Sequence, residues 1–446
     1  MPPQIALILV SMLVATVFYI ECKQSKEVSA AAWIPTIWLL YSGSKNIGTW
    51  LNIRATMEAG SVPDRWFLLS LGALGLAILL KRKFAWRFCL RNNYLLVLVV
   101  LFMLISVSWS SVPGISFRRW VRELLAIIMI SLVASETRPV RALLTAFKRS
   151  IYFYLPFSLL LIKYFPHYGR DYGRWTGDLM WIGVADQKNG LAQLCIFTAI
   201  FLIWSNWEYV SNWKSLRSRM QIYIDLFMLL LSIYLLMGPG RTFKYSATST
   251  ISLLIGLAIM IILSIRIKKG KFINKKIIIF FMILIIFFGT LLPFVRKIPM
   301  GSIATAFGRD QTLTGRTQIW ATLVPYAYKK LFLGHGKGGF WTSAMREKTS
   351  SHAHNGYLDT ILDIGIIGLL LFSIMFLWLV TQFIKLQTPY PRLSVLLICI
   401  LFMILVHNIA ESGLSDISAF PISLVVLFSA TLGQNEIQDS LSSGQI

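Results

Sequence analysis

Residues 356–383 read GYLDTILDIGIIGLLLFSIMFLWLVTQF, an apolar run whose only charged side chains are Asp359 and Asp363. An α-helix needs about 20 apolar residues to cross the hydrocarbon core of a bilayer. Both carboxylates lie near the start of the run, so residues 364–383 are free of charge. The stretch therefore predicts a membrane-spanning helix.

The rest of the chain has the same character. Of its 446 residues, 56% are hydrophobic and 14% are charged, and the mean hydropathy is +0.67. A soluble domain carries about 25% charged residues. The pattern predicts an all-α polytopic membrane protein with about 12–13 transmembrane helices, in which residues 1–446 form a single integral membrane domain. The predicted spans are Gln4–Ile20, Ala30–Leu51 (interrupted by Pro35), Arg65–Leu80, Tyr94–Trp109, Val121–Ala134, Ile151–Phe165, Gly190–Trp204, Gln221–Met237, Ser246–Ile265, Lys276–Pro293, Gly356–Phe383, Leu393–Ala410 and Ile417–Leu432.

The net charge of +24 would suggest nucleic-acid binding in a soluble protein. Here the basic residues concentrate in alternate loops between apolar runs, so membrane topology explains them better and no nucleic-acid partner is expected. The positive-inside rule places these loops in the cytoplasm and the intervening loops in the periplasm. The five cytoplasmic loops contain Lys81, Arg82, Lys83, Arg87 and Arg91; Arg138, Arg141, Lys148 and Arg149; Lys214, Arg217 and Arg219; Arg266, Lys268, Lys269, Lys271, Lys275 and Lys276; and Lys385 and Arg392.

A second set of basic residues lies in the loops assigned to the periplasm. Single side chains at helix ends can snorkel to the membrane surface, but the whole set favours an outward-facing basic pocket for an anionic group. Diphosphate fits this description, since arginine binds phosphate through a bidentate fork. The set comprises Arg118, Arg119, Arg122, Arg170, Arg174, Lys188, Arg241, Lys244, Arg309 and Arg316.

Residues 294–355 form a large predicted periplasmic loop, which we expect to carry the active site. A short helix is expected over Ile319–Leu333, with Thr314 or Thr317 as its cap. The glycine-rich run GHGKGGF at residues 334–340 should end it.

The motif HAHN at residues 352–355 comes directly before the span that starts at Gly356. His354 should therefore lie near a helix N-terminus, where a neutral imidazole can accept a proton. The alternative is a histidine that only caps the helix. Asp359 and Asp363 would share a helix face, as a glycosidase pair could. Their depth in the span favours helix packing or the orientation of His354.

Neither a metal nor another cofactor is expected. The four cysteines lie far apart without metal-ligand spacing, and the sequence lacks an Asp-x-Asp element, an HExxH motif and a P-loop. Nucleotide sugars and ATP are therefore poor candidates for the substrate.

Several of these segments resemble the O-antigen ligase/polymerase family. The runs TLTGRTQIW, LGHGKGGF and HAHNGYLDTILDIGIIGLLLF are similar to its C-terminal region, and GRDQTLTGRTQIW is most similar to its exopolysaccharide-polymerase branch. Looser similarities extend over most of the chain. They are WIPTIWLLYSGSKNIGTWL, EAGSVPDR, DQKNGLA and GPGRT.

The resemblance implies a bacterial inner-membrane glycosyltransferase with its active site facing the periplasm. Members of the family bind an undecaprenyl-diphosphate-linked glycan, hold the diphosphate with loop arginines and use a histidine before a long helix as base. Carried over by motif, the base is His354, and the arginines are Arg241 in GPGRT and Arg316 in TGRT. The other expected substrate-binding residues are Arg309, Lys188, His352, Asn355 and Glu411.

Two histidines compete for the role of base. The second histidine of this chain, His352, is a departure from the family pattern and leaves open which imidazole acts. His354 is preferred because Asn355 follows it, as in the motif.

Three functions are compatible with a lipid-linked glycan in the membrane. A polymerase would join lipid-linked repeat units, a ligase would transfer the glycan to a lipid A-core acceptor, and a flippase would move the unit across the bilayer. A flippase is less favoured because the sequence shows no clear internal repeat. The wording GRDQTLTGRT favours a polymerase of undecaprenyl-diphosphate-linked oligosaccharides, and a chain-length regulator is then a further candidate partner.

Overall fold

Seven helices in the described part of the chain are long and apolar enough to cross a membrane, which confirms the all-α polytopic membrane fold. The computed structural model describes residues 1–53, 60–82, 84, 86–172, 177–210, 216–238, 246–295 and 315–419. The seven helices are α1 (Pro3–Gln24), α4 (Val62–Lys81), α10 (Lys188–Val210), α11 (Leu216–Met237), α12 (Ala247–Lys268), α13 (Lys275–Leu291) and α17 (Gly356–Lys385).

Other predicted spans correspond to shorter or less apolar helices. Three are short apolar helices: η1 with α2 (Ala30–Ala32 and Trp33–Ser42), α6 with η2 (Tyr94–Ser106 and Val107–Trp109), and α18 (Pro391–His407). Two correspond to the second halves of the longer helices α7 (Pro113–Ala134) and α8 (Pro139–Tyr164). The predicted Ala30–Leu51 span is not one continuous helix. Helix α2 ends at Ser42, where the polar second half of the span begins, and α3 (Ile47–Trp50) follows.

The last predicted span, Ile417–Leu432, lies almost entirely outside the described residues. The remaining elements are small. They are α5 (Trp86–Asn92), α9 (Pro166–Gly169), the hairpin of β1 (Arg170–Tyr172) and β2 (Leu179–Trp181), η3 (Leu292–Phe294), α15 (Arg316–Lys329) and α16 (Ser343–Lys348).

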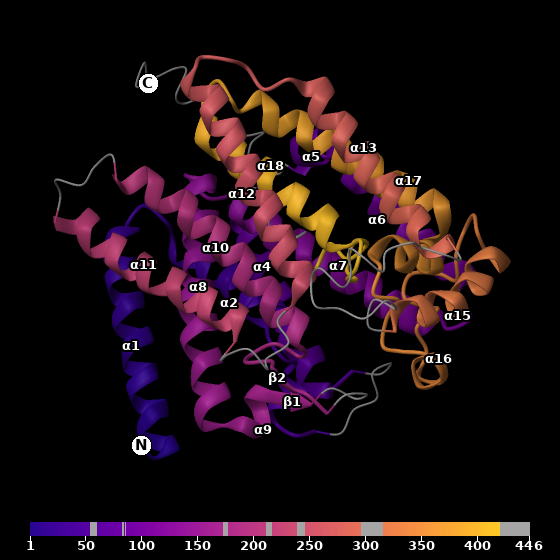
Figure 1. Ribbon diagram of the computed structural model, residues 1–446, viewed down its shortest axis with the longest axis horizontal. Coiled ribbons are helices and arrows are strands. Elements are labelled where there is room, and N and C mark those ends of the chain that lie inside the picture. The colour runs from indigo at the N-terminus through magenta and orange to yellow at the C-terminus, as the bar shows by residue number, and fades with distance from the viewer. Residues whose placement is uncertain are drawn as a thin grey trace.

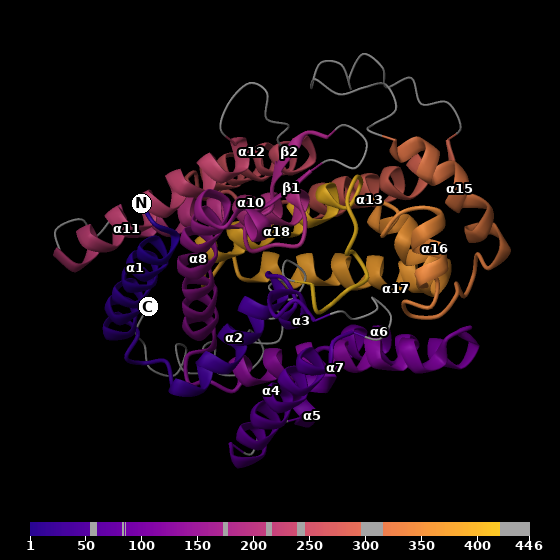
Figure 2. The same ribbon diagram turned by 90° about the horizontal axis from the view of Figure 1, so that it is seen from below.

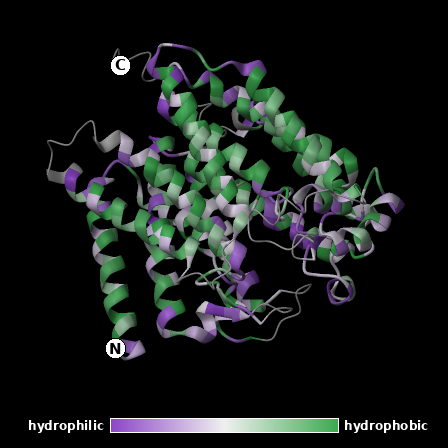
Figure 3. Cartoon of the chain, viewed as in Figure 1, coloured by the Kyte–Doolittle hydropathy of each residue, from purple (hydrophilic) through white to green (hydrophobic). Residues whose placement is uncertain are grey.

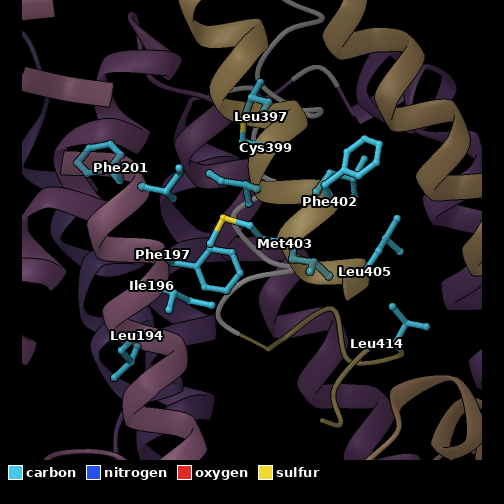
Figure 4. Close-up of a cluster of buried hydrophobic side chains, with 14 of the residues drawn as sticks. Leu194, Ile196, Phe197, Phe201, Leu397, Cys399, Phe402, Met403, Leu405 and Leu414 are labelled. Carbon is cyan, nitrogen blue, oxygen red and sulfur yellow. The ribbon is translucent and has the colours of Figure 1, made fainter. Parts of the chain in front are cut away.

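The centre of the protein is a layer of α10, α12 and α18, which lie side by side in both ribbon views (Figures 1 and 2). Phe197 of α10 and Met403 of α18 are fully buried where these helices meet (Figure 4). Gly256 of α12 allows the close approach, because a Cβ atom there would lie 2.5 Å from the sulfur of Met403. Small residues at such contacts are typical of helices that pack in membranes.

Helix α17 is not continuous, although its sequence predicted an uninterrupted span. Gly365 has φ 71° and ψ −178°, a backbone conformation that is open almost only to glycine. The chain at residues 331–335 lies against this break, so Leu331 accepts a hydrogen bond from the backbone N–H of Ile366 at 2.8 Å. The N–H of His335 donates to Leu362 at 2.9 Å, so the two segments satisfy each other's backbone groups.

Polar residues gather around α15 and α16, whereas the long helices are largely apolar (Figure 3). The expected helix over Ile319–Leu333 is present as α15, but it both begins earlier, at Arg316, and ends earlier, at Lys329. The predicted threonine cap was wrong, because the N-cap is Gly315, with φ 82° and no side-chain hydrogen bond.

Candidate functional site

Four segments that are distant in the sequence meet at Glu411. The carboxylate lies in the irregular segment that follows α18. Arg316 is the first residue of α15, Asn189 is the second residue of α10, and His354 comes two residues before α17. Each of these three side chains approaches Glu411 from the end of a helix.

The carboxylate of Glu411 divides its contacts between its two oxygens. Its Oε1 atom accepts hydrogen bonds from Nη2 of Arg316 at 2.5 Å and from Nδ2 of Asn189 at 2.6 Å. Its Oε2 atom faces His354, whose Nδ1 lies 3.5 Å away. The side chain of Glu411 is 4% exposed, so these contacts are largely shielded from water.

Burial alone would raise the pKa of the Glu411 carboxyl. The charge of Arg316 and the contact with His354 outweigh burial, so the pKa lies well below its ordinary value. Glu411 is therefore a fixed negative charge at neutral pH and a poor proton acceptor.

His354 has a strained and partly exposed position. Its φ of 52° lies in the left-handed region, which non-glycine residues rarely adopt. With Nδ1 turned toward Glu411, the neutral ring carries its proton on that atom and presents the lone pair of Nε2 on the opposite side. A carboxylate behind one imidazole nitrogen is the arrangement that orients a general base and stabilises it once protonated. The 3.5 Å separation exceeds a usual N–H···O hydrogen bond, so the attraction is mainly electrostatic.

His352 packs against His354, with ring centroids 4.0 Å apart. Its Nδ1 accepts a hydrogen bond from the backbone N–H of His354 at 3.3 Å, which places its own proton on Nε2. Burial lowers the pKa of His352 to about 3, and the neighbouring His354 acts in the same direction. His352 therefore stays neutral under physiological conditions.

The backbone around the two histidines is held by the start of α17. Asn355 caps that helix by accepting from the N–H of Leu358 at 2.8 Å, and its amide donates to the carbonyls of Gly289 and Ile409. Asp359 accepts from the N–H of Ala353 at 3.0 Å. Asn355 thus ties together segments that surround the site, while its contact with substrate stays a prediction. Asp359 likewise orients the histidine segment, as the sequence suggested.

Other expected site residues are dispersed or lie outside the described residues. Arg241 and Arg309 fall outside, and Lys188 is the first residue of α10, next to Asn189. Two members of the predicted basic set bind backbone carbonyls: Arg119 donates to Gly338, and Arg170 donates to Ile162 at 2.7 Å.

Sequence reasoning missed Asn189, although it quoted the run DQKNGLA and selected the adjacent lysine. The contact between Asn189 and Glu411 joins residues 222 positions apart, and no local sequence pattern predicts it. It also missed His407 at the end of α18, which is buried beneath the site with Nε2 3.2 Å from the hydroxyl of Ser249.

The sequence of this region matches a known family. Residues 227–373 match the family described as O-antigen ligase. This part of the chain is similar to the O-antigen ligase family. The predicted resemblance to the O-antigen ligase/polymerase superfamily is confirmed. The matched residues include His352, His354 and Arg316. Asn189 and Glu411 lie outside them.

A relative is the exopolysaccharide production protein ExoQ of Rhizobium meliloti (strain 1021). It is 25% identical to this chain over 306 residues, which is 64% of this chain and 62% of the relative. The chain is thus a multi-pass membrane protein that resembles the O-antigen ligase/polymerase superfamily and its exopolysaccharide branch.

Proposed function

We propose that this protein is a glycosyltransferase that polymerises undecaprenyl-diphosphate-linked oligosaccharide repeat units at the periplasmic face of the bacterial inner membrane. The observation that carries the proposal is that Arg316 and His354, which both lie in the part similar to the O-antigen ligase family, meet at the carboxylate of Glu411. A cation can stabilise the charge that develops on a leaving diphosphate, and an imidazole oriented by a carboxylate can act as the general base for the attacking hydroxyl.

In the proposed reaction, Nε2 of His354 takes the proton from a hydroxyl of the acceptor sugar. The hydroxyl oxygen attacks the anomeric carbon of the donor, and the bond from that carbon to the diphosphate oxygen breaks. Undecaprenyl diphosphate leaves with the electron pair, and the proton on His354 passes to solvent. Attack opposite the leaving group inverts the anomeric centre.

The charges around this path support the roles. Arg316 would stabilise the negative charge that develops on the diphosphate, together with Arg241 and Arg309 from the same domain. A charge-assisted hydrogen bond of this kind is worth about 1.5–3 kcal/mol. Glu411 would hold Arg316 and stabilise the imidazolium that forms on His354.

A polymerase is favoured over a ligase because the relative is named as an exopolysaccharide production protein. The two functions share the donor and differ in the acceptor. A polymerase product remains on undecaprenyl diphosphate, whereas a ligase product is found on a lipid A-core acceptor.

The experiment is a reconstitution of the full chain in proteoliposomes with a lipid-linked repeat unit. Extraction with organic solvent, followed by mass spectrometry, should reveal undecaprenyl-diphosphate carrying two or more repeats. The matched control is His354→Ala protein at the same density. The proposal fails if the active protein extends no donor, and transfer only to added lipid A core would assign a ligase.

A further inference from the structure

Lys337 is a lysine whose burial the proposed reaction does not explain. It is 2% exposed, although its ammonium group is among the most strongly hydrated in proteins. It lies in the glycine-rich run GHGKGGF, between α15 and α16. A buried charge needs ion-pair or hydrogen-bond partners. The partners of Lys337 therefore show which segments of the protein the lysine connects.

The ammonium group of Lys337 connects α7 to the segment that follows Glu411. Its Nζ atom lies 3.4 Å from Oε1 of Glu123 in α7, donates to the carbonyl of Ser415 at 2.9 Å and pairs with Asp416. Burial acts to lower the pKa of Lys337, but the two carboxylates outweigh it and raise the pKa above its ordinary value. The lysine therefore remains charged.

The glycines beside Lys337 allow its backbone to reach this position. Gly336 has φ 89°, and a Cβ atom there would lie 2.6 Å from Cβ of Ser110. The backbone N–H of Lys337 donates to the hydroxyl of Ser106 at 3.0 Å. The glycine-rich run thus places the backbone of Lys337 against Ser106 of α6 and near Ser110, which follows η2.

The segment after α18 is held at both ends. At its start, Ile409 accepts from Asn355 at 2.9 Å. Farther along, Ser412 donates to Asp359, and Ser418 donates its backbone N–H to Glu123 at 2.8 Å. Glu411 lies between these attachments on backbone that forms no helix or strand.

We propose that Lys337 is a positioning residue for Glu411: with Glu123, it fixes the 411–418 segment so that the carboxylate faces Arg316 and His354. The inference rests on the proposed function of the site. It gives the glycine-rich run a role, namely to place a buried cation behind the carboxylate segment. Lys337 acts through Glu411 and touches neither sugar nor diphosphate in this proposal.

The pH dependence of the site depends on the charges that surround it. The groups near Glu411 and the histidines are Arg316, His352, His354, Arg346, Asp359 and His407. The groups near Lys337 are Glu123, Asp363, Asp416, Arg119 and Arg122. A loosened Glu411 would leave the imidazolium of His354 less stabilised, which moves the rising part of the pH–rate profile to lower pH.

The test is a double-mutant cycle between Lys337→Met and Glu411→Gln, measured as repeat-unit polymerisation in proteoliposomes over a range of pH. Lys337→Met should lower kcat by about tenfold to 10²-fold, because displacement of about 1 Å in an active site has an effect of this size. The rising limb should move to lower pH. In the Glu411→Gln background, the same substitution should have little further effect. Lys348→Met, which removes a more exposed lysine of α16, is the matched control and should leave both quantities unchanged.

Since Lys337→Met leaves Glu123 unpaired, Asp416→Asn serves as a second variant. The side chain of Asp416 is 50% exposed, so its neutralisation disturbs folding less. It should move the pH limb in the same direction. The inference would be overturned if the losses of kcat from Lys337→Met and Glu411→Gln simply multiplied and the rising limb of the pH–rate profile stayed in place in both Lys337→Met and Asp416→Asn. The proposed function would survive that result as long as His354→Ala is inactive. Equal polymer from His354→Ala, Glu411→Gln and unaltered protein would instead overturn the proposed function.

Discussion

Nη2 of Arg316 lies 2.5 Å from Oε1 of Glu411, and this ion pair joins the start of α15 to the segment after α18. The two side chains are 15% and 4% exposed. Removing one partner of a buried pair leaves the other charge without compensation, which costs about 3–5 kcal/mol in measured cases. The pair therefore links the predicted diphosphate-binding arginine to the group that orients the predicted base.

Arg316→Lys should separate charge from geometry at this position. Lysine keeps the positive charge but loses the planar fork that binds a carboxylate or a phosphate through two parallel bonds. We expect polymer formation to fall by about tenfold or more, which corresponds to one charge-assisted contact. The measurement is polymer yield per inserted protein, and Arg170→Lys is the control, since Arg170 donates a hydrogen bond to the backbone carbonyl of Ile162. Near-normal polymer from Arg316→Lys would mean that the fork does not bind the leaving group.

Glu411→Gln should remove the fixed charge while it keeps the size of the side chain. Without the carboxylate, a protonated His354 loses its electrostatic partner, so the reaction should slow by about 10²-fold or more. The pH–rate profile should rise at lower pH than in the unaltered protein. Binding of the lipid-linked donor, measured by sedimentation with proteoliposomes, should weaken less than kcat falls. A full rate in the variant at neutral pH would show that the carboxylate has no part in the reaction.

The long spans were predictable because each consists of a continuous stretch of apolar residues. The bilayer demands about 20 such residues in a row, and α12, α13 and α17 meet that demand from composition alone. The break in α17 was not predictable in the same way. Its cause is the backbone of Leu331 and Phe332, whose carbonyls accept hydrogen bonds from the N–H groups of residues after Gly365. The sequence around Gly365 carries no sign of that distant partner.

The candidate site was predictable in part for a similar reason. His354 and Arg316 belong to motifs whose local wording resembles a known family. Asn189 belongs to the site only because the N-terminus of α10 and the end of α18 lie next to each other. Such contacts depend on packing in three dimensions, so a single sequence identifies the motif and misses the partner.

Gly365→Ala should destabilise the protein through the break in α17. The alanine would have to adopt φ 71°, and its Cβ would lie 2.1 Å from the carbonyl oxygen of Phe332. The strained conformation alone costs about 1–3 kcal/mol, and the contact adds to it. We expect a lower midpoint of thermal unfolding in detergent, measured by tryptophan fluorescence. Gly114→Ala is the control, because a Cβ atom there meets nothing within 4 Å; equal midpoints for both variants would refute the role of Gly365.

The predicted orientation can be tested with single cysteines. In a background without the four native cysteines, Asp171→Cys should react with a membrane-impermeant thiol reagent in intact spheroplasts, since residue 171 is exposed in a loop assigned to the periplasm. Gly270→Cys is exposed in a loop assigned to the cytoplasm and should react only after lysis. Labelling is measured by the mass shift of the protein. Reaction of position 270 from outside would reverse the orientation and place the site on the cytoplasmic face.

The last prediction concerns which histidine removes the proton. His354 faces Glu411 and is 24% exposed on its side chain, whereas His352 packs against the ring of His354 and has a strongly lowered pKa. His354→Ala should abolish polymer formation but leave donor binding intact, because a base acts in the transition state and adds little to ground-state binding.

His352→Ala should have the milder effect, and the pH–rate profile distinguishes the two histidines. The pKa of His352 is lowered to about 3, so this imidazole is neutral at every pH above that value and its titration cannot produce a rising limb near neutrality. We expect the limb to persist in His352→Ala, with a smaller maximum because the ring that packs on His354 is lost. In His354→Ala, any residual activity should show no such limb, since only a neutral imidazole accepts the proton. The reverse result, with the limb lost in His352→Ala and kept in His354→Ala, would assign the base to His352.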